Sequence, residues 1–367
     1  MTFADVFSNF IDTTGFAYLI ADPRCLIMIA ISCVLLYLAI VKGFEPLLLV
    51  PIAFGMLLTN LPGANMFHPD YFLKVVDGAT AINWAELGHG AGLIDYLYLG
   101  VKLGIYPSLI FMGVGAMTDF GPLIANPKSL LLGAAAQFGI FIAYILARLF
   151  GFTASEASSI GIIGGADGPT AIFVTTKLAP HLLGAIAVAA YSYMSLVPVI
   201  QPPVIRALTS KKERMIHMDY NEERASKLAL ILFPIIVTAV AGIIVPMSAP
   251  LVGSLMFGNL IRECGVLDRL SKTAQNELAN LVTILLGITI GGTMVADKFL
   301  RVDTLLILAL GLFAFIFDTA GGVLFAKVLN IFRKKKINPM VGAAGISAFP
   351  MSARVIQKMA KEEDPYN

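Results

Sequence analysis

Long apolar runs, separated by glycine, proline and charged residues, follow one another along most of the chain. A helix needs about 20 mainly apolar residues to cross the hydrocarbon core of a bilayer. Strands of a transmembrane barrel alternate apolar and polar positions instead and do not produce such solid runs. The pattern therefore predicts an all-α polytopic membrane protein, with spans near 24–42, 43–60, 98–118, 128–150, 184–207, 225–246, 249–264, 276–296 and 304–331.

Two further segments are moderately apolar but are interrupted by glycine, proline and hydroxyl residues. They are 154–177 (ASEASSIGIIGGADGPTAIFVTTK) and 337–358 (INPMVGAAGISAFPMSARVIQK). Irregular backbone at membrane depth is tolerated where it is buried in protein or lines a cavity. We expect each segment to form a broken helix or a re-entrant hairpin.

The two interrupted segments are similar to one another. A shift of 177 positions places Gly165 on Gly342 and Lys177 on Arg354, and the same shift aligns Gly115 with Gly292. Paired discontinuous segments in corresponding halves of a chain indicate the binding site of a transporter. The alternative is glycine-rich packing between helices, although packing alone does not require the same motif twice. We therefore expect two structural repeats.

The repeat predicts the organisation of the chain. Residues 1–207 form the first repeat with an N-terminal segment and an insertion at about 61–97, residues 208–224 a charged cytoplasmic linker, and residues 225–367 the second repeat. The shift carries the helix at 184–207 beyond the last residue, so the second repeat is expected to lack its last helix. The sequence does not decide whether that helix is absent in nature.

Orientation follows from the basic stretches at 206–227 and 333–336, which the positive-inside rule places in the cytoplasm. If 154–177 is a re-entrant hairpin, each repeat has an odd number of spans and the two repeats are inverted. If it crosses fully, they run parallel. Inversion is favoured, because it brings both interrupted segments to the midplane from opposite faces.

Composition narrows the class of protein further. The chain has 367 residues, of which 57% are hydrophobic and 14% charged. Its net charge of +2 argues against a nucleic-acid-binding protein, because such proteins carry a strongly basic surface. Three cysteines and four histidines are scattered without the spacing of a zinc site or a disulfide framework. No phosphate-binding loop or dinucleotide fingerprint is present, which argues against nucleotide-driven transport.

Asp167 is the focal residue of the first interrupted segment, and its counterpart in the second is Ala344. An ionisable group at membrane depth costs roughly 2.5 to 3.5 kcal/mol on the lenient insertion scale, so it indicates function. With the carbonyl and hydroxyl oxygens around it, the carboxylate suits a hard cation such as Na+. The alternatives are a helix-capping aspartate before Pro169 and a protonated carboxyl that exchanges Na+ for H+.

In the second segment, Asn338 and Gly342 are four residues apart and can share one face of a helix. Ser347 adds a hydroxyl at the break in that helix. Arg354, and Lys177 in the first segment, are candidates for binding an anionic carboxylate, and the bidentate fork of arginine makes Arg354 the better one. Either cation is also compatible with a plain anchor at the membrane surface.

Tyr191 and Tyr193 lie on the helix after the first interrupted segment. A buried tyrosine hydroxyl needs a partner, so one of them is expected to supply an ion ligand or a proton. The alternative is a tyrosine of the membrane-interface belt.

The motif around Asp167 (GIIGGADGPTAI), Tyr193 and the run from Asn338 to Arg354 (NPMVGAAGISAFPMSAR) closely resemble the β subunit of the biotin-dependent sodium-pumping decarboxylases, which act on oxaloacetate, methylmalonyl-CoA or glutaconyl-CoA. The resemblance implies a multi-pass subunit of a bacterial or archaeal cytoplasmic membrane. It implies that carboxybiotin on a partner subunit is decarboxylated, that Na+ is exported and that a proton from outside is consumed.

The resemblance also implies roles and partners. Na+ ligation is expected at Asp167 and Asn338, with Gly342 beside them, and ion or proton passage at Tyr193 and Ser347. Arg354 is expected to handle carboxybiotin. The implied partners are a carboxyltransferase α subunit, a biotin carrier subunit and a small membrane γ-type subunit, besides membrane lipid, and assembly with further copies of the chain stays open.

The apolar runs and the repeat alone would fit two other classes of protein equally well. One is a secondary Na+/H+ or Na+/solute transporter without decarboxylation, and the other is a membrane anchor for soluble subunits. The resemblance favours primary active transport driven by decarboxylation.

Overall fold

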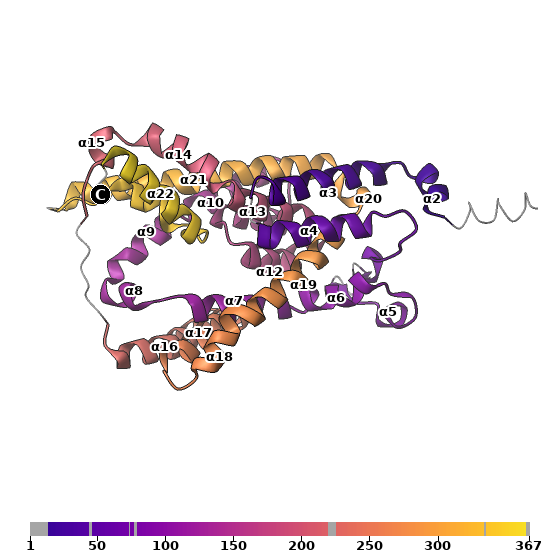
Figure 1. Cartoon of the computed structure of the whole chain (residues 1–367), viewed down its shortest axis with the longest axis horizontal. Coiled ribbons are helices and arrows are strands. Elements are labelled where there is room, and N and C mark those ends of the chain that lie inside the picture. Colours follow the sequence, from indigo (N-terminus) through magenta and orange to yellow (C-terminus); the bar gives the residue numbers. More distant parts are fainter. Residues whose placement is uncertain are drawn as a thin grey trace, which may run out of the picture.

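The computed structural model describes residues 14–43, 46–72, 74–76, 79–218, 225–333 and 335–364. The described chain is helical, which confirms the predicted fold class in its coarse form (Figure 1). The expected N-terminal segment up to residue 13 and the linker residues 219–224 lie outside the described residues.

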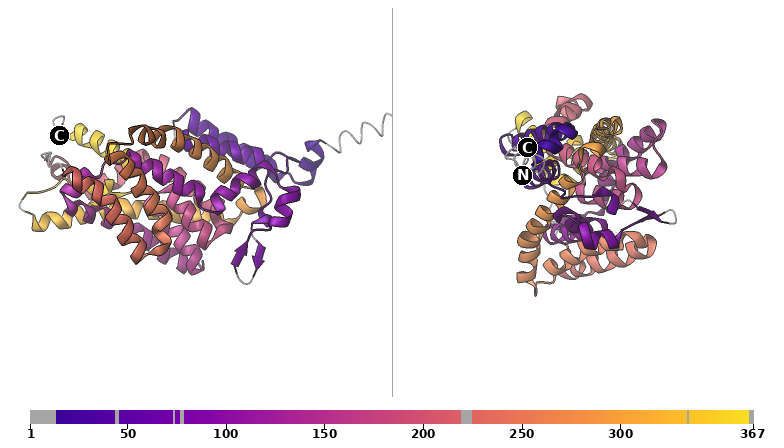
Figure 2. Two further views of the ribbon diagram at one scale, coloured as in Figure 1. Left: turned by 90° about the horizontal axis from the view of Figure 1, so that it is seen from below. Right: turned by 90° about the vertical axis from the view of Figure 1, so that its right-hand side faces the viewer.

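One short strand pair was not predicted. Strands β1 (Lys74–Val76) and β2 (Ala79–Ala81) pair antiparallel inside the expected insertion at 61–97. β-branched residues, which favour extended backbone, occupy three of these six positions. The strand pair projects from the end of the molecule that lies away from the C-terminus (Figure 2).

Helices occupy all nine predicted span positions. In chain order they include α3 (Arg24–Ile40), α4 (Pro46–Thr59), α6 (Leu93–Lys102), α7 (Ile105–Met117), α9 (Leu130–Ala135), α10 (Phe138–Leu149), α13 (Leu183–Ser195), α14 (Val197–Leu208), α16 (Lys227–Ile244), α17 (Ala249–Glu263), α19 (Ala279–Gly292) and α21 (Val302–Phe332).

Three segments are long and apolar enough to cross a membrane unaided: Leu130–Leu149, Lys227–Ile244 and Val302–Phe332. Two helix pairs, α6 with α7 and α13 with α14, also qualify together but bend by 62° and 65°. Gly104, at a left-handed φ of 76°, forms the first bend, and Pro198 is the second residue of the helix after the second bend. These segments confirm that the chain is a membrane protein. The helices α4, α17 and α19, at three of the predicted spans, are each 15 residues or shorter and are therefore shorter than a full span.

Close helix crossings are built on glycine. A Cβ on Gly115 of α7 would lie 1.8 Å from the carbonyl oxygen of Leu255 in α17, and Gly258 of α17 faces Met112 of α7 in the same way. Gly55 of α4 and Gly291 of α19 make a second reciprocal pair. Any side chain at these positions would force the backbones apart, so the glycines determine how closely the helices pack.

The segment 154–178 doubles back on itself. It consists of α11 (Ala154–Gly161), a 3-10 turn η3 (Ile162–Gly165) and α12 (Gly168–Leu178). The two ends meet again, because His181, in the 3-10 turn η4 (Pro180–Leu182) that follows α12, contacts Glu156 at 2.8 Å. We call this element the first hairpin.

The segment 338–363 forms the second hairpin, with a 3-10 stretch η7 (Pro339–Gly345) followed by α22 (Phe349–Glu363). Its ends are also brought together, since Asn338 donates to the carbonyl of Arg214 at 2.8 Å and Glu363 pairs with the Arg214 guanidinium at 2.7 Å.

The open ends of the two hairpins lie at opposite ends of the molecule. Helix α22 lies at one end (Figure 1), and Glu156 and His181 line a cavity together with Lys298 toward the other. Helices α15 (Lys211–Arg214) and α22 mark one end, which we call the basic end because it gathers Arg206, Lys211, Lys212, Arg214, Lys327, Arg354, Lys358 and Lys361. Helices α2 (Gly15–Ala21), α5 (Trp84–Gly90) and α20 (Ala296–Phe299) mark the opposite end.

Candidate functional site

The tips of the two hairpins meet inside the molecule. The amide of Ser347 donates to the carbonyl of Gly165 at 3.1 Å. Gly345, just before Ser347, lies so close to α9 that a Cβ would be 2.7 Å from the carbonyl oxygen of Leu132. The Ser347 side chain remains exposed. Irregular backbone from two hairpins therefore gathers at one place, which suits a site made of carbonyl and hydroxyl oxygens.

Asp167 lies at the tip of the first hairpin. Its side chain caps α12, accepting from the amide of Thr170 at 3.2 Å and from the Thr170 hydroxyl at 2.6 Å. The preceding Ala166 has a left-handed φ of 52°, a conformation that side chains rarely adopt. The structure thus contains the capping interaction considered above. A carboxylate has about four acceptor positions, so two bonds leave capacity for a cation.

Tyr191 is the tyrosine beside this tip. Its side chain is 2% exposed and its hydroxyl has no hydrogen-bond partner among the described residues. The ring packs on Gly168, where a Cβ would lie 2.2 Å from it and 2.8 Å from the hydroxyl oxygen. Tyr193 points elsewhere, since its hydroxyl donates to the carbonyl of Leu308 in α21. The role expected of Tyr193 as an ion ligand stays a prediction, while the hydroxyl without a partner beside Asp167 belongs to Tyr191.

Asn338 and Gly342 precede the tip of the second hairpin, and Asn338 lies at the basic end. The Asn338 side chain caps η7 by accepting from Met340, and its amide group donates to the carbonyls of Arg214 and Ile216. Gly342 packs backbone to backbone on Gly322 of α21, with no space for a Cβ on either residue. The hydrogen bonds of Asn338 and the close packing of Gly342 are sufficient to explain why an asparagine and a glycine occupy these positions. The roles of the two residues in Na+ binding stay predictions.

The two predicted carboxylate-binding cations are at opposite ends. Arg354 is exposed on α22 at the basic end, in a hollow that it shares with Gln357, Lys358, Lys361 and Glu362. Lys177 is exposed near the end of α12, where its charge is close to that of Lys102. The structure therefore does not bring Lys177 and Arg354 together.

Three buried polar side chains were missed by the sequence reasoning. Gln201 of α14 and Ser352 of α22 are fully buried and bonded to each other at 2.7 Å, and Gln201 also donates to the carbonyl of Ala343 at 3.1 Å. Asp318 is fully buried near the middle of α21. Gln201 and Asp318 are isolated polar residues inside apolar runs, the same signal that singled out Asp167, whereas Ser352 lies in a mixed polar and apolar helix that gives no such signal.

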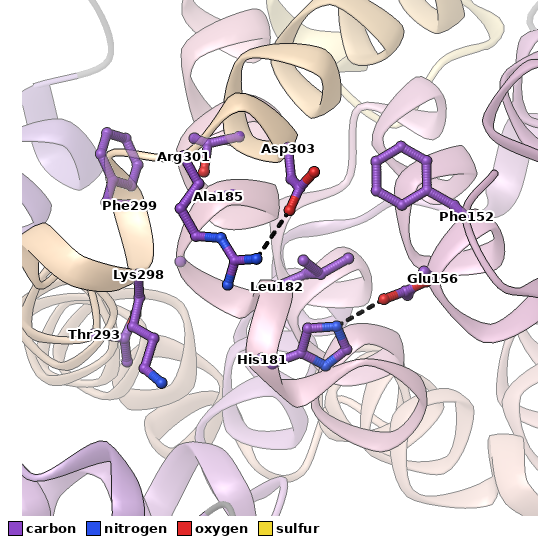
Figure 3. A pocket seen from close by; sticks show the side chains of 12 residues that line it. Phe152, Glu156, His181, Leu182, Ala185, Thr293, Lys298, Phe299, Arg301 and Asp303 are labelled. Carbon is purple, nitrogen blue, oxygen red and sulfur yellow. Dashed lines mark hydrogen bonds and ion pairs between the residues drawn. The ribbon is translucent and has the colours of Figure 1, made fainter. Parts of the chain in front are cut away.

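A small cavity of about 160 Å³ lies at the end of the molecule opposite the basic end. Figure 3 shows Glu156 and His181 pointing toward one another across it, with Arg301 paired to Asp303 nearby. Burial raises the pKa of Glu156, but hydrogen bonds from Thr153 and His181 outweigh this effect and hold the pKa below its ordinary value. The ion pair thus closes the open end of the first hairpin.

Within the described ranges, no three His, Cys, Asp or Glu side chains gather as they would around a transition metal. A site for Na+ at the hairpin tips would instead draw on single carboxylate, hydroxyl and carbonyl oxygens, the ligands of hard cations.

Comparison with known proteins gives a consistent result. A family model described as the Na+-transporting oxaloacetate decarboxylase beta subunit matches residues 24–367. The chain is 57% identical to the methylmalonyl-CoA decarboxylase subunit beta of Propionigenium modestum over 98% of this chain and 91% of that protein. It is 53% identical to the glutaconyl-CoA decarboxylase subunit beta of Acidaminococcus fermentans, over 93% and 85% of the two chains.

The oxaloacetate decarboxylase beta chain of Klebsiella pneumoniae is 50% identical, over 93% of this chain and 88% of that protein. These matches confirm the resemblance inferred from the two motifs. They cover three substrates at similar identity, so they do not separate the substrates from one another.

Proposed function

Because the chain belongs to the family of Na+-transporting oxaloacetate decarboxylase beta subunits, we propose that its two hairpin tips form the site where decarboxylation of carboxybiotin is coupled to Na+ export. The observation that carries the proposal is the contact of Ser347 with Gly165 beside Asp167. It joins the two hairpins, whose open ends face opposite ends of the molecule, beside the half-buried carboxylate of Asp167.

In this proposal Asp167 binds the transported Na+. The hydroxyl of Tyr191, which has no partner among the described residues, adds an oxygen from α13, and Ser347 adds an exposed hydroxyl from the second hairpin. Asn338, Gly342 and Tyr193 hold the second hairpin and α21 in place, or contribute ligands in another state of the pump. A monovalent cation held by few oxygens can be released when one hairpin tip moves.

The carboxylate of carboxybiotin would meet Arg354 at the basic end. Arg354 stands in a hollow with Lys358 and Lys361, and a guanidinium binds a carboxylate by two parallel hydrogen bonds. Lys177 lies at the opposite end, so we assign it a role in attracting ions there rather than in holding biotin.

The chemistry supplies the driving force. Cleavage of the bond between the ureido nitrogen and the carboxylate carbon releases CO2 and leaves an electron pair on nitrogen, which takes up one proton. Moving one Na+ outward against about 100 mV costs roughly 2.3 kcal/mol, before any concentration term. Coupling transport to the loss of CO2 makes the outward step favourable.

We also propose that residues 1–207 and 225–367 are inverted repeats. The shift of 177 positions that aligns Gly115 with Gly292 pairs α7 with α19. The residues Pro46-Leu47 and Phe54-Gly55 of α4 recur as Pro250-Leu251 and Phe257-Gly258 in α17, which pairs these two helices. In the fold, α4 packs on α19 and α17 packs on α7, each through a reciprocal pair of glycines, so the two contacts are equivalent under the repeat. The basic end then faces the cytoplasm.

The partners follow from the same proposal. A β subunit acts with other subunits, and we expect a carboxyltransferase, a biotin carrier at the basic end and a small membrane subunit. The proposed cofactor is biotin on the carrier, and Na+ is the transported substrate.

Proteoliposomes that contain the complete complex, 22Na+ outside and each of oxaloacetate, methylmalonyl-CoA and glutaconyl-CoA in turn would test the function. We expect one substrate to drive both CO2 release and Na+ uptake, and avidin to stop both. Na+ movement that continues in avidin without CO2 release would instead identify a secondary transporter.

A further inference from the structure

Besides Asp167, the membrane-spanning part of the chain contains the acid Asp318. It is fully buried near the middle of α21, in an apolar stretch from Val302 to Phe332. One oxygen, Oδ1, accepts from the amide of Gly139 in α10, and the backbone of Ile140 lies beside the carboxylate. Asp318 therefore caps the N-terminus of α10 from another helix, at the break between α9 and α10.

The other oxygen, Oδ2, has no hydrogen-bond partner among the described residues. It faces Gly164 of η3, where a Cβ would lie only 2.6 Å from it. A methyl group does not fit between the two, so a Na+ ion with its own oxygen ligands does not fit either. An ionised oxygen without a partner in an apolar interior is strongly unfavourable, and such a group neutralises by taking up a proton.

Gly164 belongs to the tip of the first hairpin, three residues before Asp167. A movement of this tip that loads or releases Na+ at Asp167 would change the packing over Asp318 Oδ2. Among the described residues, the titratable and charged side chains on the elements packed against α21 are Asp167 beyond η3, Tyr191 and Tyr193 on α13, Tyr144 and Arg148 on α10, Glu156 on α11 and Arg206 on α14.

We propose that Asp318 is the proton-carrying residue of the pump. It holds one proton while the first hairpin is packed as described here, and it gives that proton up when the tip moves. The proton passes toward the ureido nitrogen that loses CO2, and a proton from the side opposite the basic end then restores the acid. This inference rests on the proposed function and assigns the proton to Asp318 and the Na+ to Asp167.

The test uses the complete complex in proteoliposomes with its basic end outward, and the substrate that the wild type accepts. CO2 release and 22Na+ uptake are measured together with the pH inside the vesicles, reported by a trapped dye. The informative variant is Asp318→Asn, since asparagine caps a helix as well as aspartate does but carries no titratable proton. Thr319→Val is the matched control, because the Thr319 hydroxyl is buried and bonded only within its own helix.

We expect the wild type and Thr319→Val to consume protons from the vesicle interior in step with CO2 release. Asp318→Asn should lose roughly 100-fold or more in turnover, the scale of a general acid or base, and its remaining turnover should take no proton from the interior. Wild-type proton uptake per CO2 in Asp318→Asn would overturn the proposal. A shifted Na+ half-saturation with unchanged proton uptake would also overturn it, by making Asp318 a Na+ ligand.

Two further results complete the test. If the wild type releases no CO2 with any of the three substrates, the proposed function fails and not this inference alone. If Asp318→Asn does not assemble, the wild type is treated with a hydrophobic carbodiimide, which modifies protonated buried carboxyls, and labelling is located by mass spectrometry. Labelling of Asp318 that increases as the pH falls supports the proposal, and labelling of Asp167 without Asp318 contradicts it.

Discussion

The backbone of Ser347 is hydrogen-bonded to the backbone of Gly165 at 3.1 Å, although the two residues are 182 positions apart in the sequence. This bond joins the tips of two hairpins whose open ends lie at opposite ends of the molecule. A displacement of either tip is therefore transmitted to the other, which is the relationship that a pump requires between its two faces.

The Tyr191 hydroxyl should matter for Na+ and not for stability. Tyr191→Phe removes a hydroxyl that has no partner in the described part of the chain, so the fold should lose no hydrogen bond. The lost charge–dipole contact of about 1.5 to 3 kcal/mol would raise the Na+ concentration for half-maximal activity roughly tenfold or more. Sodium titration of decarboxylation measures this. Tyr193→Phe is the comparison, because it breaks the bond to Leu308 and should lower stability by about 1 kcal/mol. An unchanged Na+ requirement in Tyr191→Phe would remove Tyr191 from the site.

Gly342→Ala should destabilise the protein. A Cβ there would lie 2.0 Å from the carbonyl oxygen of Gly322, so α21 and η7 must separate, at a cost of about 1 to 3 kcal/mol. Thermal unfolding in detergent would show a lower midpoint. Gly133→Ala is the matched control, since its Cβ would meet only the Gly345 oxygen at 4.0 Å. Wild-type stability in Gly342→Ala would mean that the packing of these two segments is looser than described.

The pair of Glu156 and His181 predicts a pH dependence. The folded pKa of Glu156 is lower than its ordinary value of 4.5, so the ionised form stabilises the fold above that value and the contribution is lost as the pH falls through the folded pKa. Melting temperatures measured from pH 6 downward should fall, and Glu156→Gln should flatten this part of the profile. An identical profile in the variant would show that the pair contributes nothing to stability.

Arg354→Lys should reduce turnover with little effect on stability, because Arg354 is exposed and lysine cannot form the two parallel bonds to a carboxylate. We expect a loss of roughly tenfold or more in kcat/KM for the carboxylated carrier, measured in the complete complex. Arg206→Lys, another exposed arginine at the same end, should retain wild-type values. Full activity in Arg354→Lys would argue against a bidentate clamp.

The helices and the two interrupted segments could be predicted from sequence, because apolar length and glycine or proline content decide them locally. Rotation about a helix axis could not. Tyr191 and Tyr193 are two residues apart on one helix and so point in widely different directions, and only tertiary packing determines that Tyr191 lies at Gly168. Asp318 was detectable as a single acid in an apolar run. It lies outside the repeated motif on which the site prediction was built, and its position beside Gly164 depends on a contact between distant segments.

The most direct test of the account is the Na+ dependence of decarboxylation in Asp167→Asn. Asparagine preserves the cap on α12, so the variant should assemble. Asp95→Asn, at a fully buried acid that also caps a helix, is the control. The account predicts that Asp167→Asn loses Na+-stimulated CO2 release and 22Na+ uptake together, while Asp95→Asn keeps the wild-type Na+ requirement. Na+ stimulation of CO2 release that is unchanged in Asp167→Asn would contradict it.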